Sequence, residues 1–284
     1  MKKYVGSLLA LPGFLLLLGV LVVPVGFSIY VSLYDCDYLQ FTKFVGLGNY
    51  INILTDRSML MDFARTFYVS FLSLILSMVL GSLLAIWIDS RKRLIPYMLQ
   101  MIGLIPWVTS MVVAALLWKW LMDYELGLIN YILSLLGLGK QSILINASTS
   151  IYGVIFVMTW RTIGYSMVII LSGLKAVPAQ LEEAASIDGC ANWQILRYVK
   201  LPMIKTQLLI SSIVLTMSNI NNQVLPDALT GGGPGKSSSV ITLTMYKEGF
   251  TFARYGVSSA IALLILLVNI VLVINYVKAV KYDV

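Results

Sequence analysis

The stretch TGGGPGKSSS, residues 230–239, contains the residue types of a phosphate-binding loop, in which glycine amides and one lysine bind nucleotide phosphates. Lys236 stands in the right place, but the first glycine of the pattern is missing because Thr230 occupies its position. Such a loop also follows a buried strand, and Pro226 is poorly suited to one. We therefore expect no ATP site in this chain, and we expect the glycines and Pro234 to form tight turns.

The chain also has few cysteine and histidine side chains that could act as nucleophiles or metal ligands. The chain has no histidine, and its two cysteines, Cys36 and Cys190, lie on opposite sides of the membrane in the topology derived below. They are therefore not expected to form a disulfide. Without a cysteine–histidine cluster, we also expect no metal site, no bound cofactor and no cysteine nucleophile. An enzymatic function is disfavoured.

Polar side chains near the outer end of one apolar segment are stronger candidates. Asn219, Asn221, Asn222 and Gln223 follow Ser218 there, and Asn219 and Asn222 are spaced to share one helix face. Polar side chains within a membrane span are costly unless they face a partner or a cavity. Because amides both donate and accept hydrogen bonds, Ser218, Asn219 and Asn222 are candidates for a path that holds sugar hydroxyls. The alternative is that they join helices, at about 0.6 kcal/mol per hydrogen bond on average.

A second polar group lies in WRTIGYSM, residues 160–167. Arg161 and Tyr165 are four residues apart, with Thr162 beside Arg161, and all three are candidate pathway residues. A lone arginine deep in a span costs about 2.5–3.5 kcal/mol on insertion scales, so Arg161 should face the pathway or a backbone carbonyl. The rings of Trp160 and Tyr165 suit stacking on a sugar, or packing and anchoring at the membrane interface.

The elements that must hold these residues are membrane helices. Hydrophobic residues make up 59% of the chain, charged residues make up 12%, and the mean hydropathy is +0.88. Apolar segments of roughly 20 residues, the length that crosses a bilayer core, begin near Ser7, Phe67, Met98, Ile151, Met203 and Gly256. The sequence therefore predicts an all-α polytopic membrane protein with six transmembrane helices. The first segment runs to about Leu33, longer than a signal-peptide core, and is expected to remain as a helix.

Basic residues predict the orientation of these helices through the positive-inside rule. Eleven of them lie at the termini or in the second and fourth loops: Lys2, Lys3, Arg91, Lys92, Arg93, Lys175, Arg197, Lys200, Lys205, Lys278 and Lys281. Seven lie in the longer first, third and fifth loops: Lys43, Arg57, Arg65, Lys140, Lys236, Lys247 and Arg254. Both termini are therefore predicted to be cytoplasmic. The net charge of +7 is explained by topology and anionic lipid, and it requires no nucleic-acid partner.

Residues 175–204 form the predicted fourth loop, which is cytoplasmic and contains two short helices. For the first helix, at about 178–188, Pro178 suits the first position, Glu182 and Glu183 suit the positive end, and Gly189 suits a left-handed termination. The second helix is predicted from a cap at Asn192 to Pro202. The first helix carries a narrow face of small residues that suits a groove on another protein: Leu181, Ala184, Ala185 and Asp188.

The segment EAASIDGCANWQILRYVKLP, residues 183–202, closely resembles the EAA loop of the membrane subunits of binding-protein-dependent ABC importers. The matching residues are Glu183, Ala184, Ala185, Asp188, Gly189, Leu201 and Pro202, whereas Cys190 and Thr206 replace the usual alanine and proline. Three further stretches are similar to the sugar-importer branch that includes the larger maltose-transporter membrane subunit: FVGLGNY (44–50), TGGGPG (230–235) and EGFTFARYGVSSAIA (248–262). The resemblance covers nearly all of residues 1–284, as a single transmembrane domain.

This resemblance implies a permease subunit in a bacterial or archaeal plasma membrane, without catalytic activity of its own. Its implied partners are a second, similar permease, two copies of an ATPase, an external solute-binding protein and a carbohydrate solute. The matching loop residues would dock the helix in a cleft of the ATPase, where Glu183 can pair with a cation and Gly189 sets the bend. Asn219 and Asn222 match positions that contact solute in sugar-importer permeases.

Two other functions are compatible with six spans and polar residues within them. A secondary transporter or channel acting alone is one, although we find no inverted repeat and no paired acidic residues within the spans. A permease of the same type for amino acids or phosphate is the other, but such a permease is less expected to contain the TGGGPG and EGF stretches. The sequence does not identify the sugar.

Overall fold

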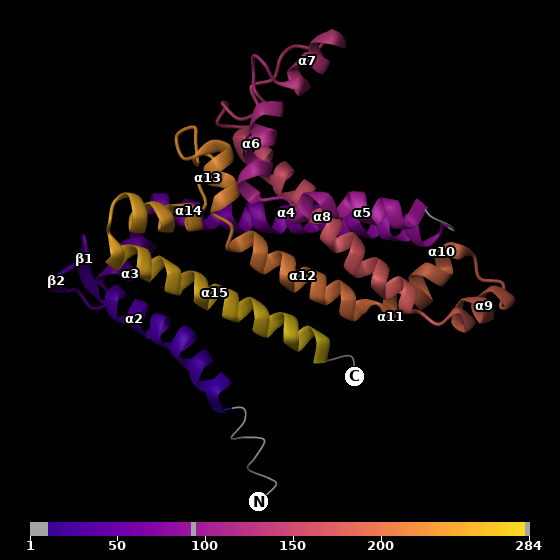
Figure 1. Cartoon of the computed structure of the whole chain (residues 1–284), viewed down its shortest axis with the longest axis horizontal. Helices are drawn as coiled ribbons and strands as arrows, with labels where there is room; N and C mark the ends of the chain where they lie inside the picture. The colour runs from indigo at the N-terminus through magenta and orange to yellow at the C-terminus, as the bar shows by residue number, and fades with distance from the viewer. Residues whose placement is uncertain (1–10, 92–94, 282–284) are drawn as a thin grey trace, which may run out of the picture. The chain divides into compact units, whose positions relative to one another are not determined.

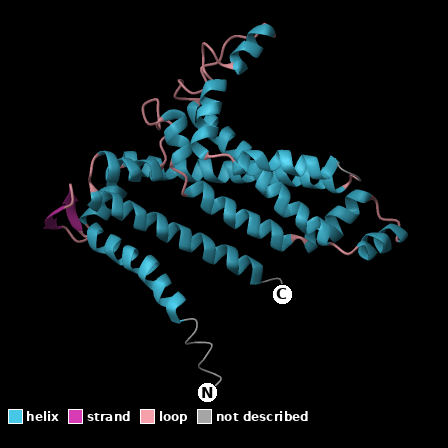
Figure 2. Cartoon of the chain, viewed as in Figure 1, coloured by secondary structure: helices cyan, strands magenta, loops and turns pink. Residues whose placement is uncertain are grey.

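The structure, a computed structural model, describes residues 11–91 and 95–281. Predictions that rest on Lys2, Lys3, Ser7, Lys92 and Arg93 lie outside the described residues. The chain forms two compact units. The first comprises the chain up to Asp62 together with Thr244–Val268, and the second comprises Phe63–Leu243 together with the chain from Asn269 onward. Helices make up most of both units, and the described strands form one hairpin (Figures 1 and 2).

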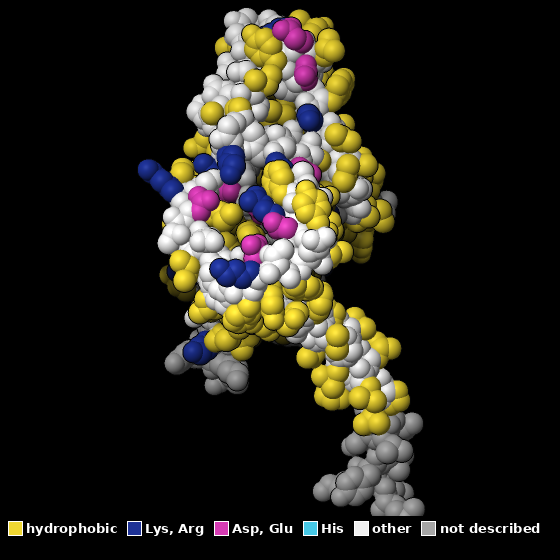
Figure 3. Space-filling model, turned by 90° about the vertical axis from the view of Figure 1, so that its left-hand side faces the viewer, with side chains coloured by type: hydrophobic (Ala, Val, Ile, Leu, Met, Phe, Trp, Pro, Cys, Tyr) yellow, Lys and Arg dark blue, Asp and Glu magenta, His cyan; other side chains and the backbone are white. Residues whose placement is uncertain are grey.

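The first unit begins with an apolar helix, Leu11–Ser32, whose last part is α2 (Val23–Ser32). Its hydrophobic side chains are almost all exposed (Figure 3), as expected of a helix that contacts lipid. The hairpin of β1 (Tyr34–Asp37) and β2 (Gln40–Phe44) follows, antiparallel, and α3 (Gly48–Thr55) comes next. Asn49 fixes this turn of the chain, because its Nδ2 donates to the carbonyls of Ser32 (2.8 Å) and Tyr34 (2.9 Å).

The remaining helices range in length from 3 residues in α11 to 33 residues in α4. They are α4 (Arg57–Asp89), α5 (Ile95–Val108), α6 (Met111–Leu121), α7 (Leu128–Leu135), α8 (Ser150–Ala176), α9 (Ala179–Ile187), α10 (Asn192–Ile195), α11 (Leu201–Met203), α12 (Lys205–Ile220), α13 (Val224–Thr230), α14 (Ile241–Tyr246) and α15 (Tyr255–Lys281). Short π-helical turns, Leu196–Lys200 and Lys247–Thr251, connect α10 to α11 and follow α14.

The second unit is built around α8, which α5 and α12 flank in Figure 1. One core cluster joins α4 to α8 near the loop 175–204 and includes Ile88, Ile170 and Leu174. The helices approach closely through glycine. A Cβ at Gly164 of α8 would fall on the carbonyl oxygen of Gly103 in α5, so that crossing tolerates no side chain on α8 at this position.

The predicted spans are confirmed as apolar helices, and the shape of one is corrected. Within the described residues, four helices are long and apolar enough to cross a membrane: Leu11–Ser32, Arg57–Asp89, Ser150–Ala176 and Tyr255–Lys278. The second of these starts ten residues before the predicted Phe67. The third span, expected as a single helix, is broken where α5 and α6 meet at 96°. A second bend, of 65°, separates 192–203 from α12 at the predicted start of the fifth span.

Local backbone features accompany both breaks. Pro106 lies inside α5 and lacks the amide that would continue the helix ladder, and Ser110 then takes an extended conformation with ψ of 135°. At the other break, Ile204 departs from helical geometry with ψ of 12°, two residues after Pro202. Counting each bent pair as one span gives the predicted total of six.

Candidate functional site

The first loop helix, α9, ends through glycine as predicted. Gly189 adopts φ of +82°. Its amide donates to the carbonyl of Ser186 (3.1 Å), and the amide of Cys190 donates to that of Ala185 (3.0 Å). This pair of hydrogen bonds satisfies the last carbonyls of the helix and reverses the chain. At the other end, Pro178 occupies the capping position just before the helix, one residue earlier than predicted.

No residue of α9 is buried. Glu183, Ala184, Asp188 and Gly189 are exposed, and Ala185 is half-buried. Beside these small residues, two large apolar side chains also face solvent: Leu181 is 43% exposed and Ile187 is 86% exposed. Leu201 is half-buried and Pro202 is exposed on the second helical segment. The loop therefore presents an apolar surface with few packing contacts of its own, which is typical of a docking element.

The second loop helix is capped differently from the prediction. Asn192 is its first helical residue, and the capping position belongs to Ala191, whose amide donates to Oε1 of Gln194 (2.7 Å). The prediction of Asn192 as the cap is therefore wrong, because a glutamine three residues after Ala191 reaches back and satisfies its amide. The helical segment continues through the π-helical turn and α11 to Met203, one residue past the predicted end at Pro202.

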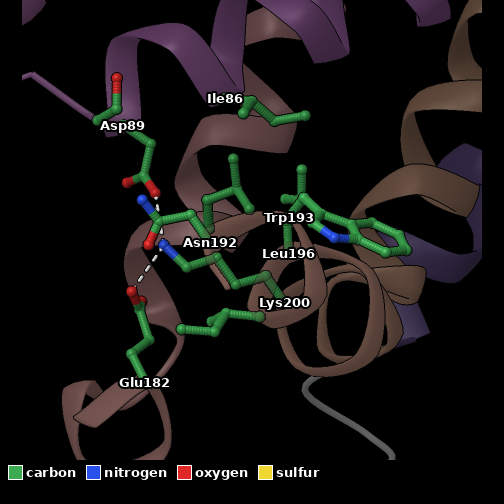
Figure 4. Close-up of a pocket in the computed structure, with 10 residues that line it drawn as sticks. Ile86, Asp89, Glu182, Asn192, Trp193, Leu196 and Lys200 are labelled. Carbon is green, nitrogen blue, oxygen red and sulfur yellow. Dashed lines mark hydrogen bonds and ion pairs between the residues drawn. The ribbon is translucent and has the colours of Figure 1, made fainter. Parts of the chain in front are cut away.

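Sequence reasoning missed a charged cluster that joins α4, α9 and the π-helical turn after α10 (Figure 4). Nζ of Lys200 contacts Oδ2 of Asp89, at the end of α4, and Oε2 of Glu182, on α9, both at 2.9 Å. These side chains line a pocket of about 400 Å³ together with Ile86, Ser90, Leu174, Asn192, Trp193, Ile195 and Leu196. The adjacent residues Glu182 and Glu183 are the sequence feature that could have predicted this cluster. Neighbouring helix residues point about 100° apart, so both carboxylates cannot face a docking partner, and one of them needs a cation within the chain.

Arg161 lies on the side of α8 that faces α5. Its Nη2 donates to the carbonyl of Trp107 (3.1 Å), and its guanidinium lies 5.1 Å from the centre of the Trp107 ring. The ring of Tyr165 packs on the same tryptophan, with centroids 4.5 Å apart. Of the two alternatives expected for Arg161, the pathway or a backbone carbonyl, the carbonyl is found. Trp160, for its part, packs edge-on against Trp118.

The other candidate pathway residues lie elsewhere in the second unit. Thr162 is buried against α4, where its Oγ1 is 2.6 Å from Oγ of Ser77. Asn219 is also buried and donates through Nδ2 to the carbonyl of Ser70 (3.3 Å). Ser218 is half-buried. The structure thus places Arg161 and Tyr165 against α5 but Thr162 and Asn219 against α4, and does not gather them in one pocket.

Asn222 lies beyond the end of α12, which stops at Ile220. The predicted helix face shared with Asn219 is therefore wrong for Asn222. Its Oδ1 accepts a hydrogen bond from the amide of Leu225 (3.1 Å), and its carbonyl accepts one from Oγ1 of Thr242 (3.2 Å). Asn222 consequently shapes the turn between α12 and α13.

These elements lie within a region that is shared with known transport proteins. Residues 77–278 match the family described as "Binding-protein-dependent transport system inner membrane component". The chain belongs to this family. The matched range contains the loop of α9, both bent helix pairs and the polar positions of α8 and α12. As an inner membrane component, the chain is a multi-pass transport subunit of the plasma membrane.

Individual relatives are similar along their whole length. The chain is 30% identical over 278 residues to the trehalose/maltose transport system permease protein MalF of Thermococcus litoralis, covering 98% of this chain and 94% of that protein. It is 31% identical over 276 residues to the osmoprotective compounds uptake permease protein GgtC of Synechocystis, covering 95% and 96%. Its fold matches a chain from a bacterial ABC transporter involved in import of the acidic polysaccharide alginate, with a TM-score of 0.85, 20% identity, and coverage of 99% and 96%.

Within this permease, the glycine-rich stretch forms turns as predicted. Gly231, Gly232 and Gly235 have positive φ angles. Oγ1 of Thr230 lies 2.8 Å from Oγ of Ser238, which closes the loop on itself. The element before the stretch is the helix α13, whereas a phosphate-binding loop follows a strand.

Proposed function

We propose that this chain is the permease subunit of an ATP-driven importer of sugars or oligosaccharides. It works with a second, similar permease, two copies of an ATPase and an external solute-binding protein. Membership of the binding-protein-dependent family supports the assembly, and relatives named for trehalose/maltose and sulfoquinovosyl glycerol transport support the class of solute.

The exposed loop helix α9 is the observation that carries this proposal. It offers Glu183, Ala184, Asp188 and the apolar Ile187 to a partner, while its other face meets the rest of the loop through Ala185 and Glu182. Small side chains allow the backbone of a docked partner to approach closely, and an exposed carboxylate can pair with a cation of the ATPase. Gly189, Leu201 and Pro202 complete the proposed coupling loop by setting the directions of the two helical segments.

The solute path is proposed to pass Ser218, Asn219 and Asn222 near the end of α12 and Arg161, Thr162 and Tyr165 of α8. The support is their polarity at membrane depth, where side chains with hydrogen-bonding groups are rare outside functional positions. Because Asn219, Asn222 and Thr162 are buried in this conformation, they would reach a solute only after the surrounding helices move apart. Ser218, Arg161 and Tyr165 are half-buried and keep part of their surface exposed without that movement.

ATP is proposed to be bound and hydrolysed on the ATPase subunits and not on this chain. The glycine-rich stretch at 230–239 follows a helix and lacks the first glycine of a phosphate-binding loop. The chain therefore acts by movement of its helices, which the ATPase drives through α9.

Uptake measurements test the proposal. Cells lacking this chain, and the same cells with the chain restored, would be given labelled maltose, trehalose, a glycosyl glycerol and an anionic oligosaccharide. We expect uptake of at least one of these sugars to be lost and then restored, and to require the ATPase. If uptake of all sugars is unchanged while that of an amino acid or phosphate falls, the family assignment stands but the proposed solute class is wrong.

A further inference from the structure

One ammonium group joins three elements of the cytoplasmic loop region. Lys200 lies on the π-helical turn between α10 and α11, and its Nζ contacts one carboxylate on α4 and another on α9, each at 2.9 Å. Figure 4 shows Asp89 and Glu182 approaching this nitrogen from opposite sides of the pocket. The Lys200 and Asp89 side chains are largely buried, at 16% and 18% exposed, and Glu182 is 36% exposed.

The ammonium of Lys200 stabilises the carboxylates of both Asp89 and Glu182. Asp89 is the last residue of α4, a helix of 33 residues, where the negative end of the helix dipole disfavours a carboxylate. Glu182 contacts the same nitrogen, so removing the ammonium would leave two carboxylates close together without a cation. Lys200 therefore holds together two groups that would otherwise repel each other.

Apart from this cluster and its contact with α10, α9 packs weakly on its neighbours. It has no buried residue, so its packing contributes little to its position. Lys200 stands at the base of the segment that bends by 65° into α12. Lys200 thus provides a side-chain contact from α9 to α4 and lies on the chain that continues into α12.

We propose that Lys200 is a positioning residue that couples α9 to the ends of α4 and α12, so that a movement of the docked loop helix becomes a movement of the membrane helices. This proposal rests on the proposed function, because it assumes that a partner moves α9. It adds the specific residue trio Lys200, Asp89 and Glu182, which lies outside the docking surface of Glu183, Ala184 and Asp188.

The test uses the complete complex with its partner permease, ATPase and binding protein in proteoliposomes. The variants are Lys200→Met, which removes the charge, Lys200→Arg, which retains it, and the control Arg197→Met on the same turn, where the side chain is exposed. Two quantities are measured: the ATPase that co-purifies, and the solute transported per ATP hydrolysed. For Lys200→Met we expect unchanged co-purification and about a 5-fold or larger fall in solute transported per ATP, within the range typical of coupling between sites.

Lys200→Arg should restore most of this ratio, and Arg197→Met should match the parent. Adding Asp89→Asn to Lys200→Met should cause little further loss, because both changes break the same cluster. The proposal is overturned if Lys200→Met transports as efficiently as the parent, or if it fails to assemble, since the cluster would then serve folding alone. A parent complex that shows no sugar uptake would instead contradict the proposed function.

Discussion

At Gly189, a substitution tests the effect of backbone strain without adding a side-chain contact to any neighbouring residue. The φ of +82° at Gly189 is strained for a residue with a Cβ, yet a Cβ there would meet no atom within 4 Å. Gly189→Val should therefore act only through the backbone, at about 1–2 kcal/mol for a β-branched residue in this region. We expect weaker co-purification of the ATPase and less ATPase stimulation by solute-loaded binding protein.

Gly189→Asn is the matched control, because asparagine adopts this conformation more readily. It should retain most of the stimulation. Equal activity of the parent and Gly189→Val complexes would show that the end of α9 has no role in coupling.

A variant of Asn219 distinguishes the two interpretations of the buried amides, which are contact with solute and hydrogen bonding between helices. The Asn219 side chain makes a hydrogen bond to the Ser70 carbonyl, and such bonds in membranes contribute about 0.6 kcal/mol on average. If Asn219 also contacts solute, Asn219→Ala should lower uptake by about 10-fold, a change of about 1.4 kcal/mol that exceeds the helix-joining contribution.

Uptake and thermal stability of the complex should be measured together. Asn221→Ala is the control for a helix-joining amide, because Asn221 is exposed and its Oδ1 accepts a hydrogen bond from Nδ2 of Asn269 on α15 (3.0 Å). Poor assembly of Asn219→Ala, with normal transport by the complexes that do form, would assign Asn219 a structural role.

At the scale of elements, the crossing of α5 and α8 depends on glycine. A Cβ at Gly164 would overlap the carbonyl oxygen of Gly103, which is backbone and cannot move aside alone. Gly164→Ala should therefore separate the helices and destabilise the protein by about 1–3 kcal/mol, as overpacking does elsewhere. The melting temperature of the purified protein in detergent measures this effect.

Gly103→Ala is the matched comparison at the same crossing. Its Cβ would lie 2.7 Å from Cε of Met167, the end of a flexible side chain that can rotate away. We expect a smaller fall in melting temperature than for Gly164→Ala. The reverse order would show that the helices are farther apart than in this structure.

At the scale of the whole molecule, the two free cysteines report topology and local environment. Cys190 is half-buried in the loop predicted to be cytoplasmic, whereas Cys36 is 1% exposed in β1. Burial raises the pKa of the Cys36 thiol, and the carboxylates of Asp37 and Asp35 add to this. Because the thiolate is the reactive form, Cys36 should react slowly at neutral pH and faster as the pH rises.

A membrane-impermeant maleimide should label Cys190 in inside-out vesicles that lack the ATPase, and should not label it in intact cells. Cys36 should be labelled only after denaturation or at high pH. The variants Cys36→Ser and Cys190→Ser assign each signal. Labelling of Cys190 from outside would reverse the predicted orientation.

Residues that lie close together in the sequence determine the membrane helices, the glycine turns and the exposed loop helix of this protein. Apolar segments of sufficient length predicted the membrane helices, because a backbone in hydrocarbon must form its hydrogen bonds internally. Gly189 predicted a left-handed helix end, the glycines at 231–235 predicted tight turns, and the matching residues of 183–202 predicted the exposed loop helix. Each of these properties depends on residues close together in the chain, so sequence patterns were enough to find them.

Contacts between distant residues were decided only by the tertiary structure. That Glu182, and not Glu183, pairs with Lys200 depends on where α4 ends, because Asp89 completes the cluster from 111 residues away. The burial of Asn219 depends on the neighbouring α4, and the departure of Asn222 from its helix face depends on where α12 stops. Charge, amide chemistry and spacing show that such residues need partners, but only the packing of the helices decides which partners they find.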